Sequence, residues 1–152
     1  MAKFKHFELD EFVRSATAEQ CGLDNTPTFE VVDRLAILVE RVLDPLREAW
    51  GSAIKVSSGY RSRALNAAVG GSATSAHLSG WAVDLQPADP GEIDEFIAFV
   101  AGWCKATGTA YDQIIDERSE RSKSSGARWC HFGLYAPDGR QRGEFKAMTK
   151  NG

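Results

Sequence analysis

Residues 75–85 read SAHLSGWAVDL, and this stretch decides the fold because it joins a small-residue loop to a buried strand. The loop Val69–Ser75 (VGGSATS) precedes it, and Trp81–Leu85 (WAVDL) is an apolar run typical of a strand. His77 ends the loop, and Asp84 lies inside the apolar run. A carboxylate in a buried strand is costly unless it is paired or bound to a metal. The stretch therefore predicts a polar site built on the sheet.

A long helix is predicted upstream of this stretch. Apolar residues recur there at helical spacing, namely Val31, Leu35, Leu38, Val42 and Leu46. We expect Thr26 to be the N-cap and Pro27 the first helical residue. Pro45 should kink or restart the helix, with Asp44 as a second cap.

The remaining elements predict an α+β domain. Ala53–Ser58 is typical of a strand and Glu92–Lys105 of an amphipathic helix. Tyr111–Asp116 and Arg128–Tyr135 are predicted to pair as a hairpin, joined by the polar loop Glu117–Ala127. We expect a mainly antiparallel central sheet flanked by helices.

Composition limits the class of protein. The chain has 152 residues and no internal repeat, which predicts a single domain over residues 1–152. Its net charge of −3 argues against a nucleic-acid partner. No apolar run reaches the ~18–20 residues of a membrane span, and Met1–Asp10 lacks the apolar core of a signal peptide. We expect a monomer, synthesised in the cytoplasm, with no membrane partner.

Two of the three histidines lie in settings suited to a metal. His77 ends the small-residue loop, and His131 lies in a predicted strand, within WCHF at 129–132. A catalytic zinc site has three protein ligands, often imidazoles and a carboxylate, and an open position for water. His77, Asp84 and His131 could meet at one metal, although a histidine beside aromatic residues can also be a packed core residue. Cys130 should face away from the metal because strand residues alternate.

Several motifs together resemble a known family. They are SSGYRS at 57–62, S-x-H-x-x-G-x-A-x-D at 75–84, YDQIIDE at 111–117 and W-x-H at 129–131. This combination is similar to the zinc D,D-peptidases, the D-Ala-D-Ala carboxypeptidase family of metallopeptidases, and especially to its phage and bacterial subgroup. The resemblance covers nearly the whole chain and weakens after Tyr135. It implies a fold like that of the D,D-peptidases and the related hedgehog N-terminal domains.

The resemblance also implies roles for individual residues. It places one zinc ion per chain on His77, Asp84 and His131. It places at Arg61 an arginine that binds substrate and stabilises the developing oxyanion, and at Ser75 a serine that contacts substrate. Arg61 could instead form a salt bridge at a helix start, and Ser75 could be a capping hydroxyl.

The general base is less directly indicated. Some relatives carry a carboxylate three residues before the last histidine, but that position is Arg128 here. The resemblance to the subgroup and to hedgehog domains places a glutamate that approaches the metal at Glu117. The predicted hairpin can bring Glu117 beside Trp129 and His131 while Asp116 points to the opposite face. Both carboxylates could also be solvated charges of the hairpin.

The expected function is zinc-dependent hydrolysis of peptide bonds in bacterial peptidoglycan stem peptides, as a D,D-carboxypeptidase, an endopeptidase or a phage endolysin. Glu117 would serve as the base, and Arg61 would share the charge of the tetrahedral intermediate. The lack of a signal peptide suits release to the periplasm and cell wall through a holin-type pore, or a virion component. Two alternatives stay open: a cytoplasmic D-Ala-D-Ala dipeptidase, and a catalytically silent zinc domain that binds a partner. The absence of a carboxylate at Arg128 favours the silent domain.

Overall fold

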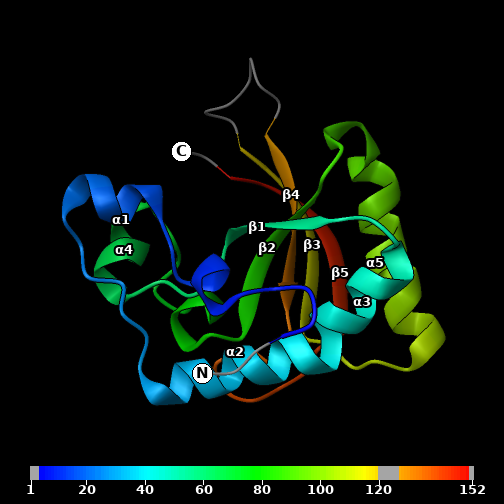
Figure 1. Cartoon of the computed structure of the whole chain (residues 1–152), viewed down its shortest axis with the longest axis horizontal. Coiled ribbons are helices and arrows are strands. Elements are labelled where there is room, and N and C mark those ends of the chain that lie inside the picture. Colours follow the sequence, from blue (N-terminus) through cyan, green and yellow to red (C-terminus); the bar gives the residue numbers. More distant parts are fainter. Residues whose placement is uncertain (1–3, 120–126, 151–152) are drawn as a thin grey trace.

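A five-stranded sheet is the centre of the fold (Figure 1). The computed structural model describes residues 4–119 and 127–150. Its strands are β1 (Ile54–Ser58), β2 (Ala82–Pro87), β3 (Gln113–Ser119), β4 (Arg128–Gly133) and β5 (Glu144–Lys150). Their order in space is β1-β2-β4-β3-β5, and each neighbouring pair is antiparallel except β3 and β5, which are parallel. The predicted α+β class with a mainly antiparallel sheet is confirmed, and one parallel pair makes the sheet mixed.

Helices lie on both sides of this sheet. They are α1 (Ala16–Cys21), α2 (Phe29–Leu38), α3 (Asp44–Trp50), α4 (Arg63–Ala68) and α5 (Ile93–Thr107), with short 3₁₀ turns η1 (Leu9–Phe12), η3 (Ala76–Ser79) and η4 (Pro90–Glu92). In Figure 1 the sheet stands between α1 and α4 on the left and α3 and α5 on the right, and α2 runs along the lower edge. Within the described residues, no helix is long and apolar enough to cross a membrane.

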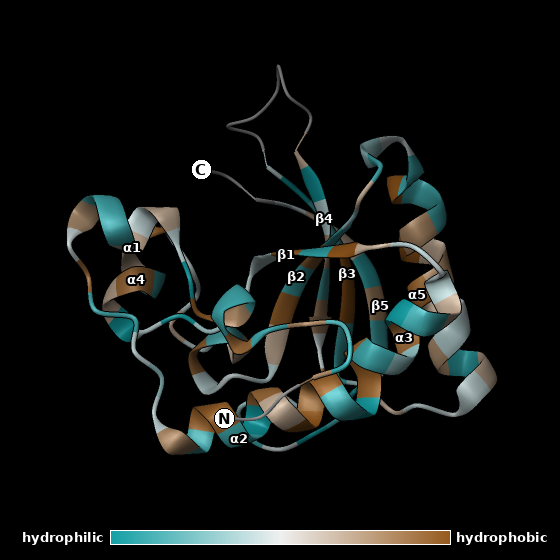
Figure 2. Ribbon diagram, viewed as in Figure 1, coloured by the Kyte–Doolittle hydropathy of each residue, from teal (hydrophilic) through white to brown (hydrophobic). Residues whose placement is uncertain are grey.

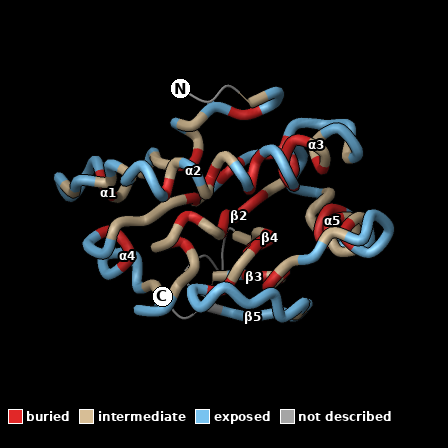
Figure 3. The backbone as a smooth tube through the Cα atoms, turned by 90° about the horizontal axis from the view of Figure 1, so that it is seen from below, coloured by how far each residue is buried: buried red, intermediate tan, exposed pale blue. Residues whose placement is uncertain are grey.

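One face of the sheet forms the hydrophobic core. Side chains alternate between the two faces of a strand. On the core face the residues are fully buried and apolar, namely Val83, Leu85, Ile114, Cys130 and Phe132. Helix α5 packs over this face on β2, β3 and β4. Figures 2 and 3 show hydrophobic, buried segments on these strands and on α2 and α5, whereas β5 is hydrophilic and mostly exposed.

The predicted long helix is one helical run broken by a π turn. The turn, η2, spans Val39–Leu43 and leads directly into α3. Pro45 lies in the first turn of α3. It has no N–H to donate, and its ring would clash with the carbonyl four residues earlier, so one α-helix could not run unbroken from α2 through this position. The wider π turn before it accommodates the proline, so the predicted restart at Pro45 is confirmed.

Both caps predicted for this run are wrong. The N-cap of α2 is Thr28, whose hydroxyl accepts a hydrogen bond from the Val31 N–H at 3.2 Å, so the helix begins after Thr28 rather than after Thr26. Asp44 does not cap α3. Its carboxylate instead accepts hydrogen bonds from the backbone N–H groups of Lys5 and His6, both at 3.0 Å, which ties down the chain before η1.

The hairpin forms as predicted, with a longer first strand. The antiparallel register pairs Ile115 with His131 and Glu117 with Trp129. The strand β3 continues to Ser119, so the beginning of the predicted loop Glu117–Ala127 is part of the sheet. The polar sequence at this point lacks the apolar alternation typical of a strand. The strand continues because these residues pair with β4 and β5. Residues 120–126 of that loop lie outside the described residues.

The edge strand β5 was not predicted. It reads EFKAMTK and carries no buried apolar face, since Phe145 is 50% and Met148 is 42% exposed. It is recruited by parallel pairing with β3, which places Lys146 beside Ile115 and Met148 beside Glu117. Backbone pairing with β3, and not hydrophobic burial, therefore forms this strand.

Candidate metal centre and active site

His77 is oriented by a backbone carbonyl. It lies in the short turn η3, where the Ser75 hydroxyl accepts a hydrogen bond from its N–H at 3.2 Å. Its Nδ1 is 2.7 Å from the carbonyl oxygen of Gly59. Because a carbonyl can only accept, Nδ1 carries the proton and Nε2 presents a lone pair. A side chain at Gly59 would collide with the backbone of Phe12, so glycine is needed where this carbonyl is placed.

Asp84 and His131 lie opposite each other on adjacent strands. The register of β2 and β4 pairs them directly, so both side chains point to the face away from the core. Asp84 Oδ1 is 3.1 Å from His131 Nδ1 and 3.3 Å from His77 Nε2. One potential ligand atom from each of the three residues lies within 4.8 Å of the others. The structure thus brings together the three residues proposed as metal ligands.

The electrostatics of the three residues suit a cation. Burial raises the pKa of Asp84, but its interactions with the side chains of His77 and His131 more than offset this, so the pKa of Asp84 is lowered. Burial lowers the pKa of His77, which keeps its imidazole neutral. Its Nε2 is buried and has no hydrogen-bond partner among the described residues, although Asp84 Oδ1 is near. A buried lone pair beside an ionised carboxylate and a second imidazole fits a divalent metal such as zinc.

Glu117 lies on the same face, close to His131. Its residue is 2% exposed. The indole Nε1 of Trp129, its partner across the hairpin, donates a hydrogen bond to Glu117 Oε2 at 3.0 Å. The other oxygen, Oε1, is 3.8 Å from His131 Nδ1. A buried carboxylate is therefore held by the strand ladder and an indole next to a candidate metal ligand, rather than solvated.

Asp116 and Arg128 point to the other face. Asp116 pairs with Cys130 in the ladder, and Cys130 is fully buried in the core. The Asp116 carboxylate accepts hydrogen bonds from Arg128 at 2.8 and 3.1 Å, and Arg128 also forms an ion pair with Asp94 at the start of α5. Of the two adjacent carboxylates, only Glu117 lies at the candidate metal centre.

Arg61 and Ser75 border the same site. The Arg61 backbone N–H donates to the His77 carbonyl at 3.1 Å, and its Nη2 is 3.5 Å from Ser75 Oγ. Burial lowers the pKa of Arg61, and the charges of Asp84 and Glu117 oppose this. Its Nε is buried without a hydrogen-bond partner among the described residues. Ser75 serves as the cap of η3, as the alternative interpretation held, while its hydroxyl also faces the guanidinium.

Two cavities flank these residues. One, of about 280 Å³, is lined by Glu117 and His131, by small residues of the loop around Ser75, and by Lys146 and Met148 of β5. A larger one, of about 600 Å³, runs along β1 beside Arg61, but the three candidate ligands do not line it. The smaller cavity is the one in which a substrate can meet both the candidate base and the metal centre.

Three features of the site were missed from the sequence. The Gly59 carbonyl lies within the SGYR motif, which was interpreted only through its arginine. Trp129 was expected beside Glu117, but the hydrogen bond from its indole to the carboxylate was not predicted. Lys146 and Met148 gave no signal, because β5 itself was not predicted.

Comparison with known proteins identifies the family. A profile of the Peptidase M15 family matches residues 5–113, which is more than half of the chain. The match includes Arg61, Ser75, His77 and Asp84 and ends at Gln113, the first residue of the hairpin that supplies Glu117 and His131. No curated protein matches the chain. On the strength of the profile match, the chain belongs to the Peptidase M15 family, a family of zinc-dependent metallopeptidases.

Proposed function

We propose that this chain hydrolyses peptide bonds in the stem peptides of bacterial peptidoglycan, with zinc held by His77, Asp84 and His131. The observation that carries the proposal is the conjunction of this three-residue centre with the buried carboxylate of Glu117, beside a cavity that Glu117 and His131 line. A three-ligand site leaves a coordination position for water, which is the arrangement of a catalytic rather than a structural zinc site.

Glu117 is the candidate general base. A bound zinc ion would lower the pKa of a coordinated water toward ~7 and polarise the scissile carbonyl. Glu117 Oε1 would accept the proton of the attacking water and return it to the leaving amine. The hydrogen bond from Trp129 to Oε2 fixes the carboxylate, so that Oε1 stays turned toward His131. Orientation of this kind keeps the base in place between the two proton transfers.

Arg61 is the candidate stabiliser of developing negative charge. Its guanidinium is partly desolvated, which strengthens its interaction with an oxyanion formed near Ser75 and the candidate metal centre. It is held through its own backbone N–H by the carbonyl of His77, so the arginine and the metal ligand are positioned together. Ser75 lies between the two and can donate its hydroxyl proton to a substrate carbonyl.

Peptidoglycan is proposed as the substrate on the basis of the resemblance to the D,D-peptidases. Polar and charged residues line the cavity together with apolar ones, which agrees with a peptide ligand. We also propose that the protein acts at the cell wall, which it would reach through a holin-type pore or as a virion component, and that it works as a monomer. The oligomeric state is measurable by light scattering of the zinc-loaded protein.

Digestion of purified peptidoglycan, followed by mass spectrometry of the soluble fragments, tests the function directly. The expected result is release of fragments that differ by cleavage of a stem-peptide amide, and their masses identify the bond. Asp84→Ala, which removes a candidate ligand, should release nothing. Intact peptidoglycan after incubation with zinc-loaded wild-type protein would refute the proposed substrate.

The catalytically silent alternative loses its main support. It rested on Arg128, which occupies the position where some relatives carry a carboxylate. In this chain that side chain lies on the core side of the sheet, bound to Asp116 and Asp94. A carboxylate is nevertheless present on the metal face, at Glu117. The geometry therefore favours an enzyme over a silent binding domain.

A further inference from the structure

A row of residues crosses the sheet at the level of the metal centre. Asp84 is paired with His131, His131 with Ile115, and Ile115 with Lys146. Directly paired residues point to the same face of a sheet, so Lys146 shares the face of the candidate metal ligands. Two strand spacings separate Lys146 from His131, which is roughly 10 Å between their Cα atoms.

Lys146 lines the cavity that contains the catalytic candidates. Its side chain is 41% exposed and borders the same hollow as Glu117 and His131. Hydroxyl-bearing residues of the loop before η3, including Thr74 and Ser75, line the cavity as well. A lysine ammonium on a flexible four-carbon stem can move to meet a charged group within such a hollow.

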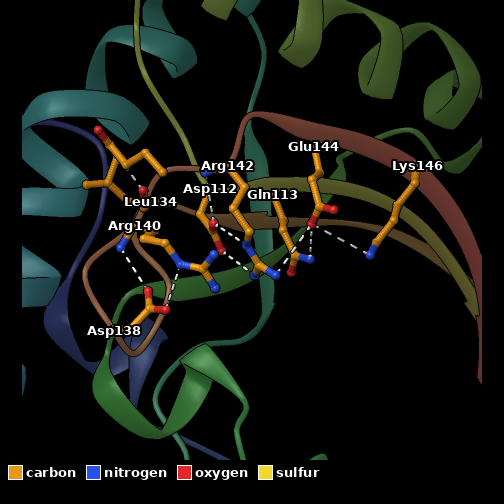
Figure 4. Close-up of polar contacts among 9 residues, drawn as sticks. Asp112, Gln113, Leu134, Asp138, Arg140, Arg142, Glu144 and Lys146 are labelled. Atoms are coloured by element: carbon orange, nitrogen blue, oxygen red, sulfur yellow. Dashed lines mark hydrogen bonds and ion pairs between the residues drawn. The ribbon is translucent and has the colours of Figure 1, made fainter.

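A chain of alternating charges leads to this lysine (Figure 4). The buried carboxylate of Asp112 accepts two hydrogen bonds from the Arg142 guanidinium, at 2.8 and 2.9 Å. Glu144 Oε1 accepts a hydrogen bond from Gln113 at 2.8 Å and lies 3.6 Å from Arg142. Lys146 Nζ is 3.8 Å from the same oxygen. The guanidinium of Arg142 is held by its two hydrogen bonds to Asp112. The contact of the Lys146 ammonium is long, and its acceptor, Glu144 Oε1, also contacts Gln113 and Arg142.

We propose that Lys146 is the anion-binding residue of the substrate cleft, and that it holds a carboxylate of the peptide being cut. The inference rests on the proposed function and adds a specificity residue to it. An extended peptide advances about 3.3 Å per residue, so a carboxylate within two or three residues of the scissile bond comes within reach of Lys146. The strand that carries Lys146 lies beyond the residues matched by the family profile.

Stem peptides offer two such carboxylates, the C-terminal one and the α-carboxylate of the D-glutamyl residue. Three synthetic pentapeptides ending in D-Ala-D-Ala distinguish them: the free acid, its C-terminal amide, and the free acid with the glutamyl α-carboxylate amidated. The zinc-loaded wild type, Lys146→Met and a matched control, Lys105→Met, are compared by kcat/KM on each peptide. Lys105 lies on α5, across the sheet from the cavity.

Lys146→Met should lower kcat/KM on the free acid by about tenfold, the worth of a hydrogen bond to a charged group. One of the two amidated peptides lacks the carboxylate that Lys146 binds, and on that peptide Lys146→Met should have the same kcat/KM as the wild type. The peptide on which the two proteins do not differ therefore identifies the bound carboxylate. Lys105→Met should behave as the wild type on all three.

Equal losses on all three peptides, or no loss on the free acid, would overturn the role of Lys146 while leaving the proposed function intact. If the wild type cut none of the peptides, the proposed function would fail. The subsite would then be judged by calorimetric affinities for the same peptides, and equal affinities of wild type and Lys146→Met for the free acid would overturn it.

Discussion

Replacing Glu117 with glutamine removes the proton acceptor while keeping the size of the side chain. If Glu117 is the general base, activity on peptidoglycan should fall by roughly 10²–10⁴, the contribution of a positioned acid–base group. At 1.36 kcal/mol for each factor of ten, this is about 2.7–5.4 kcal/mol in the activation barrier. Zinc should stay bound, because His77, Asp84 and His131 are untouched.

The cost to stability should be small by comparison. The glutamine oxygen can still accept the hydrogen bond from Trp129 Nε1, which is 3.0 Å from Glu117 Oε2. What is lost is the charge of the acceptor, and hydrogen bonds to charged groups exceed neutral ones by about 1 kcal/mol. For a chain of this size the melting temperature should fall by about 2–4 °C. The loss of activity and the loss of stability are thus separable by their size.

The assay is fragment release from peptidoglycan, measured with zinc content and melting temperature on the same preparations. Asp116→Asn is the matched control, since Asp116 is the adjacent carboxylate and binds Arg128 on the core side of the sheet. It should cost about 1 kcal/mol in unfolding free energy and no activity. Full activity of Glu117→Gln would refute its role, and loss of activity in Asp116→Asn alone would show that the base is the neighbouring residue.

Three further predictions concern the metal, the oxyanion and acid stability. Elemental analysis should find about one zinc per chain, lost in Asp84→Ala and retained in Cys130→Ser, whose side chain lies in the core. Arg61→Ala should keep zinc and lose roughly 10²–10³ in turnover, with partial recovery in Arg61→Lys; wild-type rates would return Arg61 to a structural role. Burial raises the pKa of Asp112, but the hydrogen bonds from Arg142 outweigh this, so the pKa is lowered. The pair therefore stabilises the fold fully above about pH 4, and this stabilisation is lost as the pH falls through the folded-state pKa of Asp112. The difference in unfolding free energy between wild type and Asp112→Asn should accordingly shrink in acid titrations, and a constant difference would contradict this.

Much of the fold could be predicted because its core follows simple periodicities. The helical stripe from Val31 to Leu46 and residues Ala82–Leu85 of the predicted strand are both buried, as their patterns indicate. The errors fall where the signal is local or polar. Thr26-Pro27 resembles a helix start, but the hydroxyl of Thr28 makes the capping bond. The strand β5 is exposed and polar, so hydrophobic periodicity could not reveal it.

The candidate site was predictable where it depends on strand alternation. The separation of Asp116 from Glu117, and of Cys130 from His131, follows from the two-residue period of a strand once the hairpin is assumed. Contacts that depend on the meeting of distant segments were not accessible in this way. The Gly59 carbonyl reaches His77 only because a loop after β1 packs against η3, and Lys146 joins the cavity only through the parallel pairing of β5.

The same alternation places every second side chain of the central strands β2 and β4 in the core and the side chains between them at the site. In β2, Val83 and Leu85 are fully buried against the helices, and Asp84 between them faces the candidate metal centre. In β4, Cys130 and Phe132 flank His131 in the same way. Packing of the flanking residues therefore fixes the direction of each candidate ligand, because rotating it away would expose its neighbours. This coupling explains how a carboxylate and an imidazole can be held at hydrogen-bonding distance without a loop to adjust them.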